Sequence, residues 1–549
     1  MSLEGFADYQ KEDAEKYNKL RWWLGITLGD ILDKAADLYP NKEALVDDVS
    51  RLTYSQLQEK VNRLAISLMK LGIKPGDCVL LQLPNWSEFV YSYFAISKIG
   101  AVVVLLLPGH SEVEIIHFCK VTGATAWILP EKWRKVEYLP LIDNVRQANE
   151  NLKHIILARG KESSGKFISL EKLLHDADLT EATTKELINR RPDPSEVAII
   201  LPSGGTTGLP KLAPRPHTSY ICNVEYKSRA FEMNSFDIGL LFTPVGHNLA
   251  LEAGIASLMF SFGKVVLLDS TRPEDFCSMV QQERVTYTTM VPALATRILN
   301  FDGLNNYDLS SLTKTNIGAT VVPPELVIRI EEEIGCKCLN AFGMVEGPGC
   351  QIRLDDKQEI AYYTSGRPTC PYDTFKIISE NGDELPPNTE GELIAKGPGI
   401  FTGYFKSPEE NRKVFTREGY LRTGDLAVID ELGNMRITGR IKDIIIRGGE
   451  NISASEIEAI IIVHSDVQDV AVVAMPDEEL GERVCAYVQP VAGASPGSED
   501  IISFMKSKGA AGLLLPERIE FIVELPLTKA GKADKKVLRE DIKKRLGLA

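Results

Sequence analysis

Apolar and polar residues alternate along the chain in blocks that predict strands and helices in turn. Short apolar runs at 101–107 and 126–129 have the length of buried strands. Stretches with helical spacing, among them 56–71 and 89–99, come before these runs, and each is followed by a glycine. Alternation of buried strands with amphipathic helices is typical of parallel sheets covered by helices. We therefore expect an α/β fold whose strands are mostly parallel and buried.

The same alternation continues beyond the polar stretch 161–194, which we expect at the periphery. Further strands are predicted at 197–201, 239–243, 264–268, 286–291 and 315–319, with helices at 220–231 and 249–262.

The pattern changes after about residue 371. Short alternating segments are interrupted by Asn381-Gly382, Pro386-Pro387 and Leu432-Gly433, which is typical of antiparallel strands joined by tight turns. The last hundred or so residues mix short strands with helices and predict a small α+β domain. We therefore predict a large N-terminal domain, residues 1–440, built of parallel α/β subdomains and a β-rich subdomain. A small mobile α+β domain, residues 441–549, is predicted to follow.

Composition and charge narrow the classes of protein. The formal net charge of −14 argues against a general nucleic-acid or anionic-membrane binder, so an anionic ligand needs a local positive site. No apolar run is long enough to span a bilayer, and the polar start does not have the pattern of a signal peptide. The nine cysteines are scattered, which favours reduced thiols and a cytoplasmic protein. Neither they nor the seven histidines form a zinc pattern.

One loop combines glycines, hydroxyls and a lysine directly after the predicted strand 197–201. Glycines let backbone N–H groups point toward one anion, and hydroxyls and an ammonium add further donors, so the loop suits a polyphosphate. It is not a Walker P-loop, because Leu-Pro-Lys follows its last glycine. The alternative is a flexible connector. The residues concerned are Ser203, Gly204, Gly205, Thr206, Thr207, Gly208 and Lys211.

Single charged residues mark four other stretches. Glu346 lies among small and apolar residues, where a carboxylate suits Mg²⁺ or simply begins a turn. Asp425 follows a glycine and suits a ribose diol or an Asx-turn. Arg440 lies at the predicted domain boundary and serves either a ligand or a solvated linker. The lysine-rich stretch 527–536 is an ordinary solvated surface unless one lysine has a special partner.

The order of these motifs resembles the adenylate-forming superfamily, which includes acyl- and aryl-CoA synthetases, peptide-synthetase adenylation domains and luciferases. The resemblance spans about 28–545. It is carried by SGGTTGLPK, FGMVEG, GELIAKGP, YLRTGD, GRIKD, GGENIS and LTKAGK, in that order. Within the superfamily, GHN at 246–248, FGMVEG and RLDD at 353–356 look most like 2,3-dihydroxybenzoate–AMP ligases and related aryl-acid ligases.

The resemblance implies two half-reactions: a carboxylate attacks the α-phosphate of ATP and releases pyrophosphate, and a thiol then displaces AMP. It implies that the glycine loop holds the β- and γ-phosphates and that Glu346, with Thr206, holds Mg²⁺. Lys532 matches the lysine that neutralises the α-phosphate and the carboxylate, Lys442 matches the hinge, and Gly449 matches the tunnel for the thiol. The residues implied to hold the nucleotide further include Gly318, Ala319, Thr320, Asn340, Ala341, Phe342, Gly343, Met344, Asp425, Ile437 and Arg440.

The acid site departs from the aryl-ligase pattern. Asn248, after His247, matches the asparagine that touches the aryl acid, but Ala253 stands where a serine reads a ring hydroxyl and Leu249 where tyrosine is usual. These losses favour an aryl or alicyclic acid with fewer polar ring groups than a catechol. Val345 replaces a common threonine, so Glu346 is expected to hold the metal without that hydroxyl.

Three functions remain open at this point. The first is synthesis of a CoA thioester, and the second is loading of the acid onto the phosphopantetheine arm of a carrier protein. The third is a non-catalytic nucleotide-binding regulator, which the retained Lys211, Glu346, Asp425, Arg440 and Lys532 oppose. The expected partners are a small carboxylic acid, ATP and CoA, with no nucleic acid. A carrier protein and a homodimer are left open.

Overall fold

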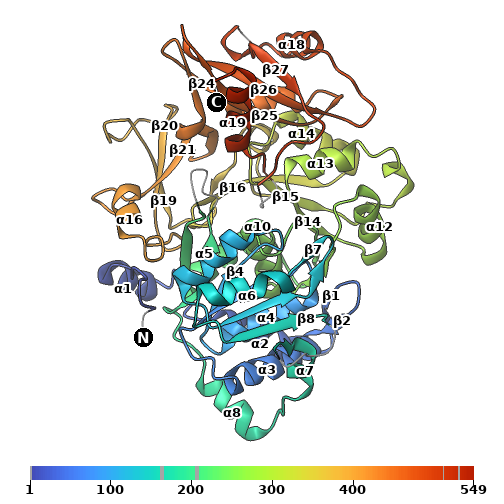
Figure 1. Cartoon of the computed structure of the whole chain (residues 1–549), viewed down its shortest axis with the longest axis vertical. Helices are drawn as coiled ribbons and strands as arrows, with labels where there is room; N and C mark the ends of the chain where they lie inside the picture. Colours follow the sequence, from blue (N-terminus) through green and yellow to red (C-terminus); the bar gives the residue numbers. More distant parts are fainter. Residues whose placement is uncertain (1–2, 161–165, 204–208, 511, 529–531, 549) are drawn as a thin grey trace.

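The computed structural model describes residues 3–160, 166–203, 209–510, 512–528 and 532–548. Two large sheets and their helices form the lower part of the molecule, a third sheet lies at one side, and a fourth sheet with three helices lies at the top (Figure 1). In the described ranges, no helix is both long and apolar enough to cross a bilayer. The cysteines are all buried, and none of them forms a disulfide.

The first sheet has the strand order β11-β10-β4-β3-β5-β8-β9 and confirms the parallel pattern expected from the sequence. Only β11, beside β10, is antiparallel within it. Its strands are β3 (Cys78–Leu81), β4 (Val102–Leu105), β5 (Ala126–Pro130), β8 (His154–Ala158), β9 (Ile168–Ser169), β10 (Val197–Pro202) and β11 (Leu212–Pro216). A separate hairpin is formed by β6 (Lys132–Trp133) and β7 (Val136–Glu137).

The second sheet has the order β18-β17-β16-β15-β14-β12-β13-β1-β2. Its six central strands, β16, β15, β14, β12, β13 and β1, are parallel. The edge strands β2, β17 and β18 pair antiparallel to their neighbours. Its strands are β1 (Glu43–Val46), β2 (Arg51–Thr53), β12 (Ile238–Leu241), β13 (Lys264–Leu267), β14 (Tyr287–Met290), β15 (Lys314–Gly318), β16 (Lys337–Gly343), β17 (Gly349–Gln351) and β18 (Arg367–Pro368).

Helices between these two sheets share one apolar core. This core joins residues of β3 and β4 to residues of β12 and β13 through α2 (Leu28–Leu38), α3 (Tyr54–Lys70), α4 (Ser87–Lys98), α9 (His217–Ala230) and α11 (Ser257–Phe260). The helices begin where the sequence supplies caps: the Thr53 hydroxyl accepts from the N–H of Gln56, and the Gln56 side chain accepts from the N–H of Thr53.

The remaining helices cover the outer faces and the edges. They are α1 (Lys11–Lys19), α5 (Glu112–Thr122), α6 (Leu139–Ala148), α7 (Leu170–His175), α8 (Glu181–Asn189), α12 (Pro273–Glu283), α13 (Pro292–Leu299), α14 (Pro324–Arg329), α15 (Gln358–Tyr363) and α16 (Pro408–Val414). The polar stretch expected at the periphery contains α7 and α8, which lie at the lower end of the molecule in Figure 1.

The helix predicted over 249–262 is interrupted. It consists of α10 (Asn248–Ala250), a π-helical turn (Leu251–Ala256) and α11. The Ser257 hydroxyl donates to the carbonyl of Glu252, five residues earlier, at 2.7 Å. Periodicity does not reveal a single wide turn, and such turns occur often at functional sites.

The segment after residue 371 forms the antiparallel sheet expected from its turns, in the order β19 (Thr374–Ile378), β20 (Gly391–Lys396), β21 (Leu421–Ile429) and β22 (Met435–Arg440). A 3₁₀ turn, Ile441–Asp443, then leads into the last sheet.

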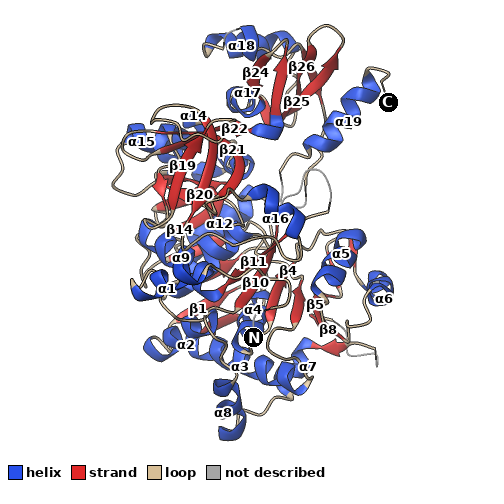
Figure 2. Ribbon diagram, turned by 90° about the vertical axis from the view of Figure 1, so that its left-hand side faces the viewer, coloured by secondary structure: helices blue, strands red, loops and turns tan. Residues whose placement is uncertain are grey.

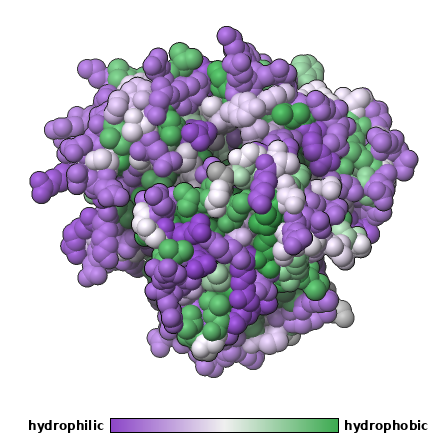
Figure 3. Space-filling view, turned by 90° about the horizontal axis from the view of Figure 1, so that it is seen from above, coloured by the Kyte–Doolittle hydropathy of each residue, from purple (hydrophilic) through white to green (hydrophobic). Residues whose placement is uncertain are grey.

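The C-terminal part is an α+β unit, as expected. Its strands are β23 (Ile444–Arg447), β24 (Glu450–Ser453), β25 (Val467–Asp477), β26 (Gly481–Pro490) and β27 (Arg518–Phe521). Its helices are α17 (Ala454–Ile461), α18 (Ser498–Ser507) and α19 (Lys535–Arg545). One apolar cluster joins the sheet to α17 and α18, and another joins it to α19. Figure 2 shows this unit set apart above the sheets. Its upper face is a mixture of hydrophilic residues and smaller hydrophobic patches (Figure 3).

Candidate active site

The carboxyl ends of the parallel strands carry the predicted nucleotide residues. Gly318 at the end of β15 is paired in register with Ala341 in β16. Ligands of open α/β sheets bind at this edge. Ala319, the next residue, has φ of +76°, a left-handed conformation that is uncommon and strained for a side chain other than glycine. Thr320 follows it and is exposed.

The other predicted residues of this edge have varied surroundings. The Asn340 amide donates to the carbonyl of Thr364 at 3.0 Å, which ties β16 to the segment before β18. Phe342 packs against an apolar cluster of the third sheet, and Ile437 in β22 packs against the same cluster. Gly343 is exposed at the end of β16, and Met344 follows it in the turn.

The glycine loop connects β10 to β11. At its base the N–H of Ser203 donates to the carbonyl of Lys211 at 2.7 Å. Gly204, Gly205, Thr206, Thr207 and Gly208 lie outside the described residues.

Lys211 and Glu346 both contact Tyr404. The Lys211 ammonium lies 5.0 Å from the centre of the Tyr404 ring and forms an ion pair with Glu410. The Tyr404 hydroxyl donates to Glu346 Oε1 at 2.6 Å. One tyrosine therefore contacts a cation with its ring and a buried carboxylate with its hydroxyl.

Glu346 lies in the turn between β16 and β17 and is 4% exposed. Burial raises the pKa of its carboxyl, and the hydrogen bond from Tyr404 opposes this rise. The described residues contain no cluster of three or more carboxylate, histidine or cysteine ligands for a metal. One carboxylate is nevertheless sufficient for Mg²⁺ that takes its other oxygens from water and phosphate, so the site fits a phosphate-bound magnesium ion.

Asp425 and Arg440 face each other across β21 and β22. Arg440 Nε lies 2.7 Å from Asp425 Oδ1, and the two residues are partners in the register. Asp425 Oδ2 is buried and has no hydrogen-bond partner among the described residues. A buried carboxylate oxygen without a donor is costly, so a ligand hydroxyl that donates to it is favoured.

Lys532 comes from the C-terminal unit and lies among these residues. Its carbonyl accepts from the N–H of Thr528 at 2.6 Å, which closes the loop that carries it. Burial, then repulsion from Arg440, lowers the pKa of its ammonium to about 8, although attraction to Asp425 and Glu346 opposes the change. Burial and then Lys532 likewise lower the pKa of His247 to about 4. The structure therefore brings Lys532 together with the predicted nucleotide and acid residues.

With the role that the resemblance implies for Lys532, the lowered pKa of its ammonium predicts an alkaline limit for the first half-reaction. Only the protonated ammonium neutralises anions, and with a pKa of about 8 it loses its proton far below the ordinary 10.5. The kcat/KM for pyrophosphate exchange is therefore expected to fall as pH rises through about 8. Lys532→Arg keeps its charge throughout, so its residual activity is expected to lack this limb. If Lys532→Arg kept the same alkaline limb, that limb would belong to the titration of another group.

The predicted hinge and thiol-tunnel residues lie on either side of β23. Lys442 is in the 3₁₀ turn that joins β22 to β23, and its neighbour Asp443 forms a 2.7 Å ion pair with Arg539 of α19. Gly449 is exposed at the tip of the β23–β24 hairpin, where Gly448 and Gly449 have φ of +58° and +92°. Two consecutive positive φ values explain the glycine pair. In this arrangement Lys532 lies among the predicted nucleotide residues.

The predicted acid residues begin the interrupted helix. The ring of His247 accepts from the N–H of Leu249 at 3.3 Å, which caps α10. Asn248 accepts from the hydroxyl of Tyr220 at 3.1 Å. Ala253 is fully buried in the π-helical turn, and its carbonyl accepts from the hydroxyl of Tyr287.

Several polar residues of this region escaped the sequence prediction. Nothing in the sequence showed that Tyr404 reaches Glu346. Glu252 is the only charged residue in the apolar segment 249–262, and that isolation was a usable signal. Lys227, its partner on α9, had none, because charged residues are ordinary on a helix whose buried face is unknown.

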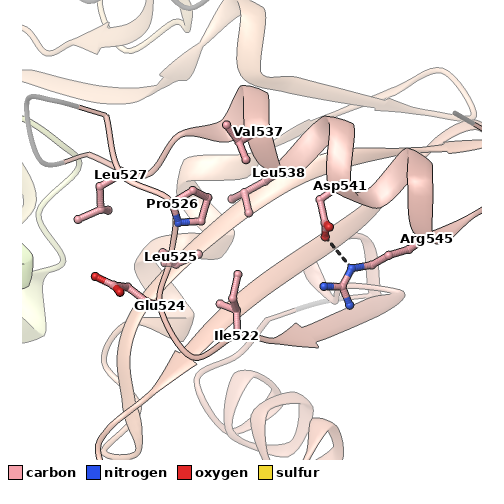
Figure 4. A pocket seen from close by; sticks show the side chains of 9 residues that line it. All are labelled: Ile522, Glu524, Leu525, Pro526, Leu527, Val537, Leu538, Asp541 and Arg545. Atoms are coloured by element: carbon pink, nitrogen blue, oxygen red, sulfur yellow. Dashed lines mark hydrogen bonds and ion pairs between the residues drawn. The ribbon is translucent and has the colours of Figure 1, made fainter. Parts of the chain in front are cut away.

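One pocket of about 470 Å³ lies outside this site, in the C-terminal unit (Figure 4). It is bounded by the Asp541–Arg545 pair and by Leu527, whose partner Ala533 directly follows Lys532. The pocket thus lies beside the base of the loop that carries Lys532.

Comparison with known proteins identifies the family of this chain. Residues 32–405 match the family of AMP-binding enzymes, and residues 456–532 match the AMP-binding enzyme C-terminal domain. A 2,3-dihydroxybenzoate-AMP ligase of Bacillus subtilis (strain 168) is 35% identical, with 99% of each chain covered. A protein of Streptomyces sp described as salicylyl-CoA synthase / salicylate adenylyltransferase is 34% identical, covering 99% of this chain and 98% of the relative. The apo structure of Mycobacterium smegmatis MbtA has a TM-score of 0.74 and 32% identity, covering 98% of this chain and all of that one.

The fold defines an α/β protein with a large unit and a separate, smaller C-terminal unit. The chain belongs to the adenylate-forming AMP-binding enzymes.

Proposed function

We propose that this enzyme activates an aryl or alicyclic carboxylic acid as its acyl-AMP, releases pyrophosphate, and then transfers the acyl group to the thiol of CoA. The observation that carries the proposal is the position of Lys532. A residue from the C-terminal unit lies among Asp425, Arg440, Glu346 and His247, which the large unit supplies.

In the first step a carboxylate oxygen of the acid attacks the α-phosphorus of ATP, and the bond to the β-phosphate oxygen breaks. Negative charge grows on the α-phosphate as two anions approach, and the Lys532 ammonium neutralises it. Asp425 Oδ2 accepts from a ribose hydroxyl, while Arg440 fixes the carboxylate. Gly318 and Ala341 approach the adenine from their paired strand ends.

The departing pyrophosphate lies toward the glycine loop and Lys211. Mg²⁺, when bound by Glu346 and phosphate oxygens, offsets the charge of the leaving group. Glu410, which now neutralises Lys211, must release it when phosphate binds.

The second step requires a different arrangement of the C-terminal unit. We place the boundary of the two domains after Arg440, so that rotation about Lys442 withdraws Lys532 and brings Gly449 to the site. The thiol then attacks the acyl carbon, loses its proton and displaces AMP. Such a hinge has two discrete states.

A carrier-protein thiol is the alternative acceptor, because the matched relatives include one described as a salicyl-AMP ligase / salicyl-S-ArCP synthetase and one described as a salicylyl-CoA synthase. Both acceptors use the same first step.

Pyrophosphate exchange with ATP, measured over benzoate, the hydroxybenzoates, 2,3-dihydroxybenzoate and cyclohexanecarboxylate, tests the proposal. Exchange with at least one acid is expected, followed by thioester formation when CoA is added. Exchange with 2,3-dihydroxybenzoate alone would contradict the inference drawn from Ala253. No exchange with any acid would favour the nucleotide-binding regulator.

A further inference from the structure

Two charged residues form a buried pair beside the proposed acid site. Lys227 Nζ lies 3.1 Å from Glu252 Oε1, with the side chains only 10% and 3% exposed. Lys227 comes from α9 and Glu252 from the π-helical turn, so the pair joins two elements. Replacing a buried pair of this kind by apolar residues is often neutral or stabilising, so packing alone gives little reason for it.

The pair is connected to Asn248. Glu252 Oε2 accepts from the Asn248 amide at 3.1 Å, and Asn248 Oδ1 accepts from the Tyr220 hydroxyl at 3.1 Å. Tyr220 and Lys227 are seven residues apart on α9, and therefore lie on one face of that helix. Glu252 uses one oxygen for Asn248 and the other for Lys227, which fixes the ammonium relative to the acid site.

The ammonium has donor capacity left. It carries three N–H groups, and Glu252 is its one ionic partner among the described residues. Gly343 adjoins it: a Cβ on that glycine would lie 4.0 Å from Lys227 Nζ. Since Gly343 is exposed at the end of β16 and has no side chain, the ammonium is not covered from that side.

We propose that Lys227, held by Glu252, is a specificity-determining residue that donates a hydrogen bond to an uncharged acceptor on the ring of the acid. The acceptor is a hydroxyl or carbonyl oxygen or a ring nitrogen. A substrate with a second carboxylate or an ammonium adds an unpaired charge to this neutral pair and is disfavoured. The inference rests on the proposed function, and it assigns to Lys227 the polar contact that Ala253 cannot make.

The test compares two double variants in pyrophosphate exchange. Lys227→Met with Glu252→Gln removes both charges but keeps an acceptor for Asn248. Lys264→Met with Glu283→Gln is the control, because that pair is similarly buried and its atoms lie 2.7 Å apart in β13 and α12. This pair also contacts Glu43 and Arg51. The acids are benzoate and cyclohexanecarboxylate, the three monohydroxybenzoates and the pyridinecarboxylates.

The wild-type enzyme is expected to prefer one of the acids that carry an acceptor. The first double variant should lower kcat/KM for that acid about 10- to 100-fold, the effect of losing a hydrogen bond to a charged group. Benzoate should change less than about threefold, and the KM for ATP should not change.

Two results would overturn the inference while leaving the proposed function intact. One is a wild-type preference for acids without an acceptor. The other is an equal loss for every acid, as expected of the control pair, which would give Lys227 and Glu252 only a structural role. Absence of exchange with all acids in the wild type would instead reject the proposed function itself.

Discussion

Replacing Lys532 with alanine is expected to lower the rate of acyl-AMP formation about 10²- to 10³-fold, because the variant loses the cation that meets the growing charge on the α-phosphate. Thiol transfer from acyl-AMP supplied in the assay should remain, since that step uses the arrangement in which Lys532 is withdrawn. The two half-reactions are measured separately, by pyrophosphate exchange and by release of AMP from acyl-AMP in the presence of CoA.

Lys536→Ala is the matched control, because Lys536 is an exposed lysine four residues away at the start of α19. It should leave both half-reactions unchanged. An equal loss of both half-reactions in Lys532→Ala would contradict the role proposed for this residue and would indicate damage to the C-terminal unit.

Replacing Asp425 with alanine is expected to raise the KM for ATP about 10- to 100-fold, since the ribose loses charge-assisted hydrogen bonds. The KM for the acid should change little. Glu392→Ala is a suitable control: Glu392 pairs with Arg422 in the same sheet, so this variant also leaves an arginine without its carboxylate. A rise in the KM for the acid with no effect on ATP would place Asp425 elsewhere in the site.

The parallel sheets, the antiparallel sheet after residue 371 and the C-terminal α+β unit were all predictable, because buried strands and tight turns leave local patterns in the sequence. The π-helical turn was not, since one additional residue in a turn barely alters the spacing of apolar positions. The turn matters for the acid site, because it contains Glu252, which pairs with Lys227 and Asn248.

The sequence also showed which types of residue the site contains more readily than it showed which of them are in contact. Asp425 and Arg440 are close in the chain, and both were predicted to hold the nucleotide. Tyr404 is 58 residues from Glu346, and Lys227 is 25 residues from Glu252, so both contacts depend on how separate elements pack. The roles assigned to the site residues stay predictions for the experiments above.

Under the hinge motion proposed above, the burial of Lys532 would make closure of the C-terminal unit depend on what is bound. Bringing the ammonium from water into this site lowers its pKa from 10.5 to about 8, which opposes closure at neutral pH by about 3 kcal/mol. A bound triphosphate and carboxylate reverse this penalty, because their negative charges restore the preference for the protonated amine. Ligand binding and domain closure are therefore thermodynamically linked, and each favours the other by the same factor. Such linkage would make the closed state more favourable in the loaded site than in the empty one.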